Sequence, residues 1–123
     1  MKRFLKTVSA LLAAMIAVGM LASCSPAKPV DMKAIAAVID VRTPAEVATG
    51  HLQGSVNIDI SSPDFASQID ELDHAANYVI YCHSGNRAGQ AISYMQSAGF
   101  SGNLVNAGGV DSASQLTGLK ITN

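Results

Sequence analysis

Cysteine and histidine are scarce in this sequence, which has two cysteines and three histidines among its 123 residues. The histidines are scattered and show no spacing typical of metal ligands, so we expect no metal site and no cofactor. Internal repeats are absent, and low complexity is confined to one short linker. The length allows a single domain with one small core.

The sequence also lacks an apolar run long enough to cross a membrane comfortably. The longest run, "VSALLAAMIAVGMLA" at residues 8–22, follows three basic residues, Lys2, Arg3 and Lys6. A positive start followed by a short apolar segment is typical of a secretory signal. We therefore expect residues 1–23 to be a signal peptide that is cleaved off.

The cleavage region carries a resemblance of its own. Residues 21–24 are "LASC" and resemble the lipobox of bacterial lipoproteins, whose cysteine takes a diacylglycerol and becomes the new N-terminus. The resemblance implies that Cys24 is lipidated, that residues 24–31 are a linker, and that the protein is extracytoplasmic and anchored to a bacterial membrane by lipid. The alternative is an ordinary signal peptide with a cysteine near its cleavage site.

Basic charge is scarce in the remainder of the chain. Residues 1–23 contain three of the eight Lys and Arg residues and none of the nine Asp and Glu residues, which leaves five basic and nine acidic residues, a net charge of −4. A chain of this charge is not expected to bind nucleic acid or anionic lipid headgroups.

Short apolar runs alternate with segments of helical periodicity. We expect strands at residues 36–41, 55–60, 77–81 and within 102–109, and helices at residues 43–50, 62–72 and 88–98. Strands that alternate with helices predict an α/β domain, here residues 32–123, with a central and mainly parallel sheet of four to five strands flanked by helices.

Capping residues mark the expected helix ends. Thr43 with Glu46 three residues later forms a capping box, which gives Glu46 a sufficient local role. Ser62 followed by Pro63 predicts the start of the next helix. Gly99 is suited to the C′ position of the third helix.

The loop "CHSGNR", residues 82–87, follows the apolar strand at 77–81 and precedes a helix. Ligands of parallel sheets bind beyond the carboxyl ends of the strands, and a helix N-terminus favours an anion there. Ser84, Gly85 and Asn86 allow the backbone to curl into a nest of N–H groups. We therefore expect Cys82 to ionise readily, although a free cysteine is more commonly an inert buried hydrophobe.

Three segments carry a family resemblance. Together, "VIDVRTPAEVATGHLQGSVNI", "YCHSGNRAGQA" and "NAGG" resemble single-domain rhodaneses, and the last two are closest to the small periplasmic phage-shock type. The resemblance covers about residues 36–110 and implies a rhodanese-like three-layer domain. It also implies a sulfurtransferase, in which Cys82 takes a sulfane sulfur from thiosulfate or a similar donor as a persulfide. A thiophilic acceptor, cyanide or a thiol, then receives the sulfur.

The remaining candidate site residues are Arg87, His83, Asp40 and Arg42. Arg87 is a candidate cation for the sulfonate end of the donor. His83 either assists the thiolate or points to solvent. Asp40 and Arg42 match the family's Asp-x-Arg pair, and the resemblance implies structural support under the active loop.

Departures from the family and competing functions remain open. Many rhodaneses carry a tryptophan after the "GG" turn, whereas this chain has none and has Ala113 near that place, which puts a C-terminal helix in question. Cysteine-dependent phosphatases and arsenate reductases use a similar loop with the spacing C-x5-R, one residue longer than here. A sulfur carrier or redox sensor that uses Cys82, and an inactive binding module, are further alternatives.

Overall fold

The computed structural model describes residues 28–123, so the expected signal peptide, Cys24 and the first part of the linker lie outside the described residues. The elements in chain order are η2 (Met32–Ala34), β1 (Ile35–Asp40), α2 (Pro44–Val47), β2 (His51–Leu52), β3 (Val56–Asn57), α3 (Phe65–Asp70), β4 (Asn77–Tyr81), α4 (Asn86–Ser97), β5 (Leu104–Asn106), α5 (Val110–Thr117) and β6 (Ile121–Thr122).

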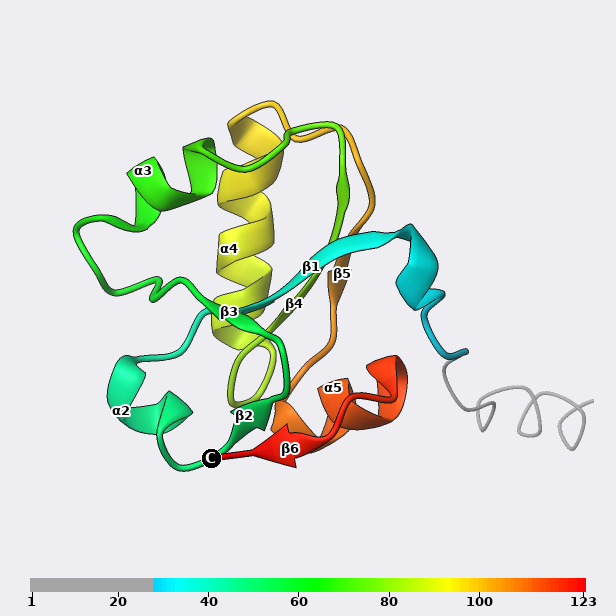
Figure 1. The fold of residues 1–123 in the computed structure, drawn as a ribbon. Coiled ribbons are helices and arrows are strands. Elements are labelled where there is room, and N and C mark those ends of the chain that lie inside the picture. The colour runs from blue at the N-terminus through cyan, green and yellow to red at the C-terminus, as the bar shows by residue number, and fades with distance from the viewer. Residues whose placement is uncertain (1–27) are drawn as a thin grey trace, which may run out of the picture.

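Four strands form a wholly parallel central sheet in the order β3-β1-β4-β5 (Figure 1). The chain runs from β1 outward to β3 and then returns to place β4 on the other side of β1. The strand order therefore reverses between β1 and β4, and the register pairs Asp40 at the end of β1 with Tyr81 at the end of β4. Open α/β sheets bind ligands at such a reversal.

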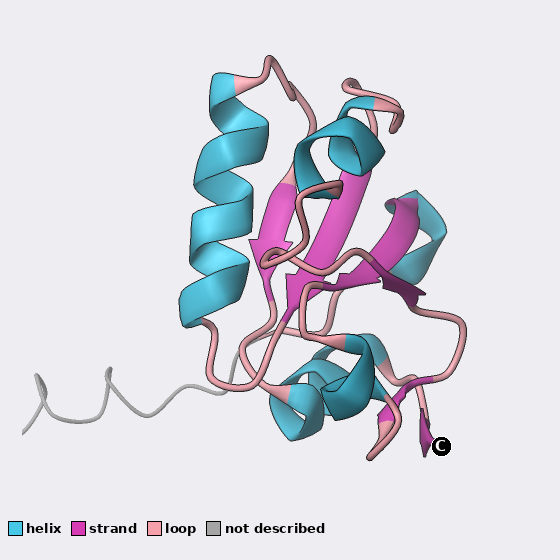
Figure 2. Ribbon diagram, turned by 90° about the vertical axis from the view of Figure 1, so that its left-hand side faces the viewer, coloured by secondary structure: helices cyan, strands magenta, loops and turns pink. Residues whose placement is uncertain are grey.

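Successive residues of the central strands face opposite sides of the sheet, and both sides are covered. On one side Ile39 and Ile80 pack with residues of α3 and α4. On the other side Val38 and Val79 pack with Ala113 of α5. Figure 2 shows α4 along one face of the sheet, and the expected α/β domain of helices flanking a parallel sheet is confirmed.

Helix α2 begins as its sequence predicts. Thr43 Oγ1 accepts the N–H of Glu46 at 3.3 Å, and Glu46 Oε1 accepts the N–H of Thr43 at 3.4 Å, so the capping box is present. The C′ glycine after α4 is also confirmed, because Gly99 has a φ of +96°.

Helix α3 starts later than its sequence predicts. Its N-cap is Asp64 and its first residue is Phe65, so Ser62 and Pro63 are wrong as cap and first helical residue. The reason is local: Ser62 Oγ accepts the N–H of Asp64 at 3.2 Å, and the Ser62 carbonyl accepts the N–H of Phe65. These bonds close a turn ahead of the helix.

Three further differences concern the strands and the C-terminal end. The strand expected at residues 55–60 is reduced to β3, Val56–Asn57. A C-terminal helix does form, α5, in spite of the missing tryptophan, and Ala113 is fully buried in it. Strands β2 and β6, which sequence reasoning did not anticipate, pair antiparallel apart from the central sheet.

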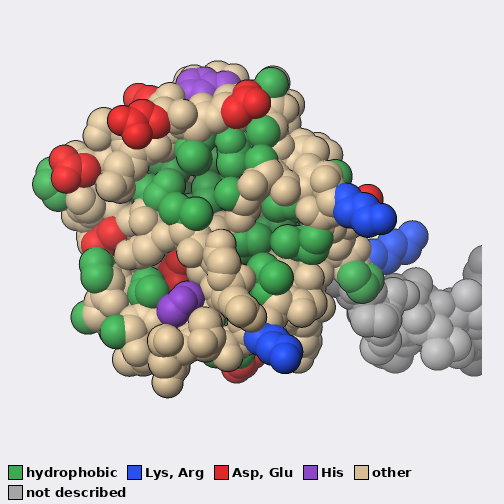
Figure 3. Space-filling model, in the orientation of Figure 1, with side chains coloured by type: hydrophobic (Ala, Val, Ile, Leu, Met, Phe, Trp, Pro, Cys, Tyr) green, Lys and Arg blue, Asp and Glu red, His purple; other side chains and the backbone are tan. Residues whose placement is uncertain are grey.

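Figure 3 shows the charged side chains of one face of the molecule. On this face the basic side chains lie toward the right-hand and lower edges, some of them next to each other, and the acidic ones lie largely around the α3 side. Within residues 28–123, no helix combines the length and apolar character that crossing a membrane requires.

Candidate active site

Cys82 lies directly after β4, at the carboxyl edge of the sheet. Its N–H donates to the carbonyl of Gly108 at 2.9 Å, and the residue is 1% exposed. It is the free cysteine of the described part of the chain. The thiol is therefore held in a fixed place at the end of a central strand, beside the end of β1.

Backbone donors surround this thiol. The N–H of Gly85 donates to Cys82 Sγ at 2.9 Å. Burial is the largest single influence and raises the pKa of the Cys82 thiol, but hydrogen bonding from the loop backbone outweighs it, so the pKa is lowered from its ordinary value. The contributing N–H groups belong to Ala88, Ser84, Gly85 and Arg87. A thiol whose pKa is lowered in this way forms the nucleophilic thiolate more readily than an ordinary cysteine does.

The curl of the loop depends on two glycines. Gly85 is the N-cap of α4 and has a φ of +93°, a left-handed conformation that residues with a side chain rarely adopt. Gly109 lies against the loop from the β5–α5 side, where an added Cβ would sit 2.4 Å from the carbonyl oxygen of His83. The backbones of the loop and of the "GG" turn therefore approach each other so closely that a side chain at position 109 would not fit between them.

Asn106 connects the same two loops, and sequence reasoning missed it. Its Nδ2 donates to the Gly85 carbonyl at 2.9 Å, while its Oδ1 accepts the N–H of Gly108 at 3.0 Å. Asn106 ends β5, next to β4, so the "NAGG" motif that carried part of the resemblance was the available signal.

Arg87 and Glu46 form a bidentate ion pair. Arg87 NH1 donates to Glu46 Oε1 at 2.7 Å, and NH2 donates to Oε2 at 2.8 Å. The Arg87 hydrogen bond lowers the pKa of Glu46 to about 2, and the pKa of Arg87 is raised in turn. The anion that Arg87 needs at a helix start is thus supplied by the protein itself. Glu46, which the capping box already explained, gains a second role.

Asp40 and Arg42 form a buried ion pair at the end of β1. Asp40 is 0% exposed and Arg42 is 4% exposed, and Arg42 NH2 lies 2.7 Å from Asp40 Oδ2. Arg42 NH2 also donates to the Gly50 carbonyl at 2.7 Å, and the amide of Asn57 donates to the Asp40 carbonyl at 2.9 Å. The hydrogen bond to Asp40 raises the pKa of Arg42. The pair therefore joins β1 to the segment that leads into β2.

The expected loop residues take different positions around Cys82. Ser84 and Gly85 contribute their backbone N–H groups to the thiol, whereas the side chains of His83, Ser84 and Asn86 are exposed. Across residues 28–123, the acidic, cysteine and histidine side chains form no group of three that could hold a metal ion.

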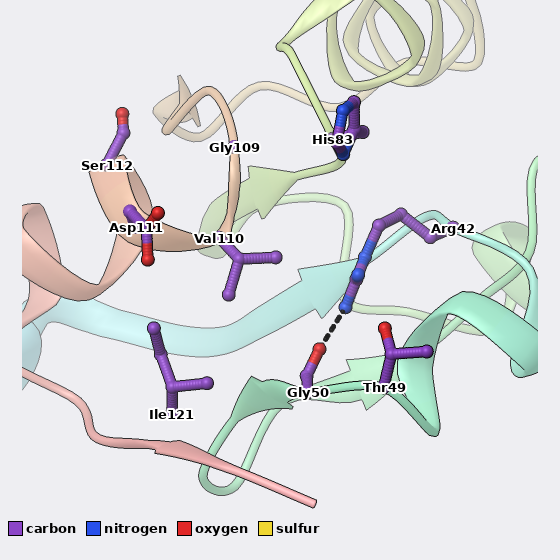
Figure 4. A pocket seen from close by; sticks show the side chains of 9 residues that line it. All are labelled: Arg42, Thr49, Gly50, His83, Gly109, Val110, Asp111, Ser112 and Ile121. Carbon is purple, nitrogen blue, oxygen red and sulfur yellow. Dashed lines mark hydrogen bonds between the residues drawn. The ribbon is translucent and has the colours of Figure 1, made fainter.

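A cavity of about 570 Å³ opens beside the loop. His83 lines one wall, the first turn of α5 lines another, and Ile121 of β6 lies across from it (Figure 4). Arg42 also faces the cavity and is directed at the Gly50 carbonyl. The side chains of Cys82 and Arg87 do not line this cavity, so it adjoins the thiol site and is separate from it.

The sequence profile of the rhodanese-like domain matches residues 27–115. The chain belongs to the rhodanese-like family. This assignment agrees with the strand order, with the thiol at the end of β4 and with the backbone cradle around it.

Curated rhodanese relatives include thiosulfate sulfurtransferases. The thiosulfate sulfurtransferase GlpE of Stutzerimonas stutzeri is 37% identical over 67 residues, which cover 54% of this chain and 59% of that protein. GlpE of Pseudomonas aeruginosa is 42% identical over 67 residues, covering 54% of this chain and 58% of that protein. The chain thus spans about 60% of the length of these relatives.

Solved rhodanese structures share the fold. A rhodanese-related protein of Thermoplasma volcanium superposes with a TM-score of 0.60 at 24% identity, covering 78% of this chain and 98% of that one. A rhodanese with anions from E. coli has a TM-score of 0.57 at 26% identity, covering 71% of this chain and 96% of that one. These similarities support the rhodanese fold.

Proposed function

We propose that this rhodanese-like protein is a sulfurtransferase of the thiosulfate type, with Cys82 as the residue that carries the sulfur. The observation that carries the proposal is the backbone cradle around the Cys82 thiol, with the Gly85 N–H 2.9 Å from Sγ. Such donors stabilise a negative charge on sulfur both before transfer, as a thiolate, and after it, as a persulfide.

Arg87 supports the same chemistry as a cation for the anionic donor. A guanidinium has five N–H donors, and the two bonds to Glu46 leave three for a bound anion. The side chain is 31% exposed. We propose that Arg87, held in place by Glu46, attracts the sulfonate end of the donor while Cys82 attacks the outer sulfur.

The direct test is mass spectrometry of the reduced protein after incubation with thiosulfate. Transfer adds one sulfur atom, about 32 Da, to Cys82, and cyanide then removes it as thiocyanate. A protein that gains no sulfur from thiosulfate is not a thiosulfate sulfurtransferase. A persulfide that forms but is discharged slowly by every acceptor would identify a sulfur carrier.

The Glu46 and Thr43 side chains allow the ion pair to be separated from the capping box. Glutamine serves a capping box as well as glutamate does, so Glu46→Gln keeps α2 and loses the charge. We expect Glu46→Gln to lower kcat by about tenfold with little change in stability, because Arg87 is no longer held by a charge. Steady-state kcat and KM for thiosulfate, with thermal melts, measure both effects.

The matched control is Thr43→Ala, which removes the cap and leaves Arg87 paired with Glu46. We expect it to cost about 1 kcal/mol of unfolding free energy and to keep kcat within about twofold. Equal losses of kcat in the two variants would show that Glu46 acts through α2 and not through Arg87.

A phosphatase or arsenate reductase is the second candidate, and the length of the loop disfavours it. A transferred phosphoryl group presents three equatorial oxygens that need donors, whereas a persulfide adds one atom to the thiol. We expect no hydrolysis of aryl phosphates above that of the Cys82→Ser variant. Phosphatase activity that disappears in this variant would favour the second candidate over sulfur transfer.

We also propose that residues 1–23 direct export and that Cys24 carries the lipid anchor. The support is the sequence of residues 2–24, since these residues lie outside the described part of the chain. We expect Cys24→Ser to shift the protein from the membrane fraction to the soluble fraction with sulfur transfer intact. Fractionation of the producing cells measures the shift, and a variant that still sediments with membranes would exclude the lipid anchor.

A further inference from the structure

We propose that the cavity beside His83 binds the organic part of a thiol acceptor, and that Asp111 makes it select thiols that carry an ammonium group. This inference rests on the proposed sulfur transfer, because it concerns the second half of that reaction. It assigns the cavity a ligand class, small aminothiols, distinct from the inorganic donor.

The cavity lies next to the loop that carries Cys82. His83, the residue after Cys82, lines it, and so does Gly109, whose neighbour Gly108 accepts the N–H of Cys82 at 2.9 Å. Cys82 itself is 1% exposed, so an acceptor has to approach the outer sulfur of a persulfide from the surface beside the loop. The cavity adjoins that approach.

Its volume is that of a site for small organic molecules. About 570 Å³ is within the range of cavities that hold such ligands. Two apolar side chains line it, Val110 on α5 and Ile121 on β6. Ile121 is 45% exposed, and its side chain would be covered by the methylene groups of a bound thiol.

The charged side chains that line the cavity differ in whether they already have an ion-pair partner within the protein. Arg42 is already neutralised by Asp40, whose Oδ2 lies 2.7 Å from Arg42 NH2. Asp111, in the first turn of α5, is exposed, and within residues 28–123 its carboxylate forms no ion pair. Asp111 therefore offers a bound ligand a negative charge, which favours an ammonium group over a carboxylate beside it.

The transfer step itself balances. The acceptor thiolate attacks the outer sulfur of the Cys82 persulfide and forms a new sulfur–sulfur bond. The bond between Cys82 Sγ and the outer sulfur breaks, and its electron pair returns to Sγ as the thiolate. One persulfide and one thiolate are consumed and one of each is formed, so the step needs no oxidant, reductant or net proton.

The experiment begins with the protein loaded by thiosulfate, with the persulfide verified by mass. Its discharge is then timed with cysteamine, 2-mercaptoethanol and 3-mercaptopropionate, each at matched thiolate concentration. Wild type is compared with Asp111→Asn and with the control Asp64→Asn, which makes the same change at the exposed N-cap of α3. Ratios between variants cancel the intrinsic reactivity of each thiol.

We expect the ratio of the cysteamine to the 2-mercaptoethanol rate constant to fall about fivefold in Asp111→Asn and to stay unchanged in Asp64→Asn. We also expect the ratio of the 3-mercaptopropionate to the 2-mercaptoethanol rate constant to rise in Asp111→Asn and to stay unchanged in Asp64→Asn. If the persulfide forms but both ratios are the same in all three proteins, the aminothiol inference is wrong while sulfur transfer stands. If no persulfide forms, both fail.

Discussion

Replacement of Cys82 by serine is expected to reduce sulfur transfer from thiosulfate to less than about one per cent of the wild-type rate, because a serine hydroxyl is hardly ionised at neutral pH. The fold should be retained. Serine is close to cysteine in size, and its Oγ is able to accept the Gly85 N–H that now lies 2.9 Å from Sγ. Stopped-time assays of thiocyanate formation measure the loss.

Two observations make this result interpretable. The thermal melt of Cys82→Ser should stay within a few degrees of wild type, which separates lost chemistry from lost structure. Mass spectrometry after thiosulfate should show no added sulfur on the variant. Residual transfer above a few per cent in a folded variant would mean that another group carries the sulfur.

Replacement of Asp40 by alanine is expected to have the largest effect on stability. It leaves Arg42, which is 4% exposed, without its carboxylate partner, and removing one member of a buried pair costs about 3 to 5 kcal/mol. A domain of this size has only about 5 to 15 kcal/mol of unfolding free energy. Urea unfolding followed by circular dichroism measures the difference.

The matched controls distinguish charge from volume. Asp40→Asn keeps the shape and loses the charge, so it should be destabilised to an intermediate degree. Asp64→Ala removes a carboxylate from an exposed position and should change the unfolding free energy by less than about 0.5 kcal/mol. If Asp40→Ala changed the unfolding free energy by less than about 1 kcal/mol, the pair would not be the structural link between β1 and the segment before β2 that its contacts indicate.

Much of the fold was accessible from the sequence because its signals are local. The run at residues 77–81 is apolar because β4 is covered on both faces, and the capping box of α2 is formed by residues three apart. The predicted start of α3 was wrong because the Ser62 side chain accepts the same kind of hydrogen bond in a turn as in a helix cap. Only the surrounding chain decides between the two.

The candidate site could be predicted from the sequence only where its residues are neighbours along the chain. Cys82 and the loop residues are contiguous, so their position after an apolar strand was sufficient to predict a backbone cradle. Glu46 and Arg87 are 41 residues apart, and Glu46 already had a local partner in Thr43, so nothing in the sequence required a second one. The pairing of β2 with β6 joins two-residue strands whose sequences carry no alternation to detect.

The cradle around Cys82 consists of backbone, and this has a consequence for how the loop can vary among related proteins. The side chains of Ser84 and Asn86 are exposed, so other residues at these positions leave the N–H groups where they are. Position 85 has no such freedom, because its φ of +93° favours glycine. Relatives with different side chains at positions 84 and 86 can therefore keep the same backbone cradle, whereas a side chain at position 85 would strain it.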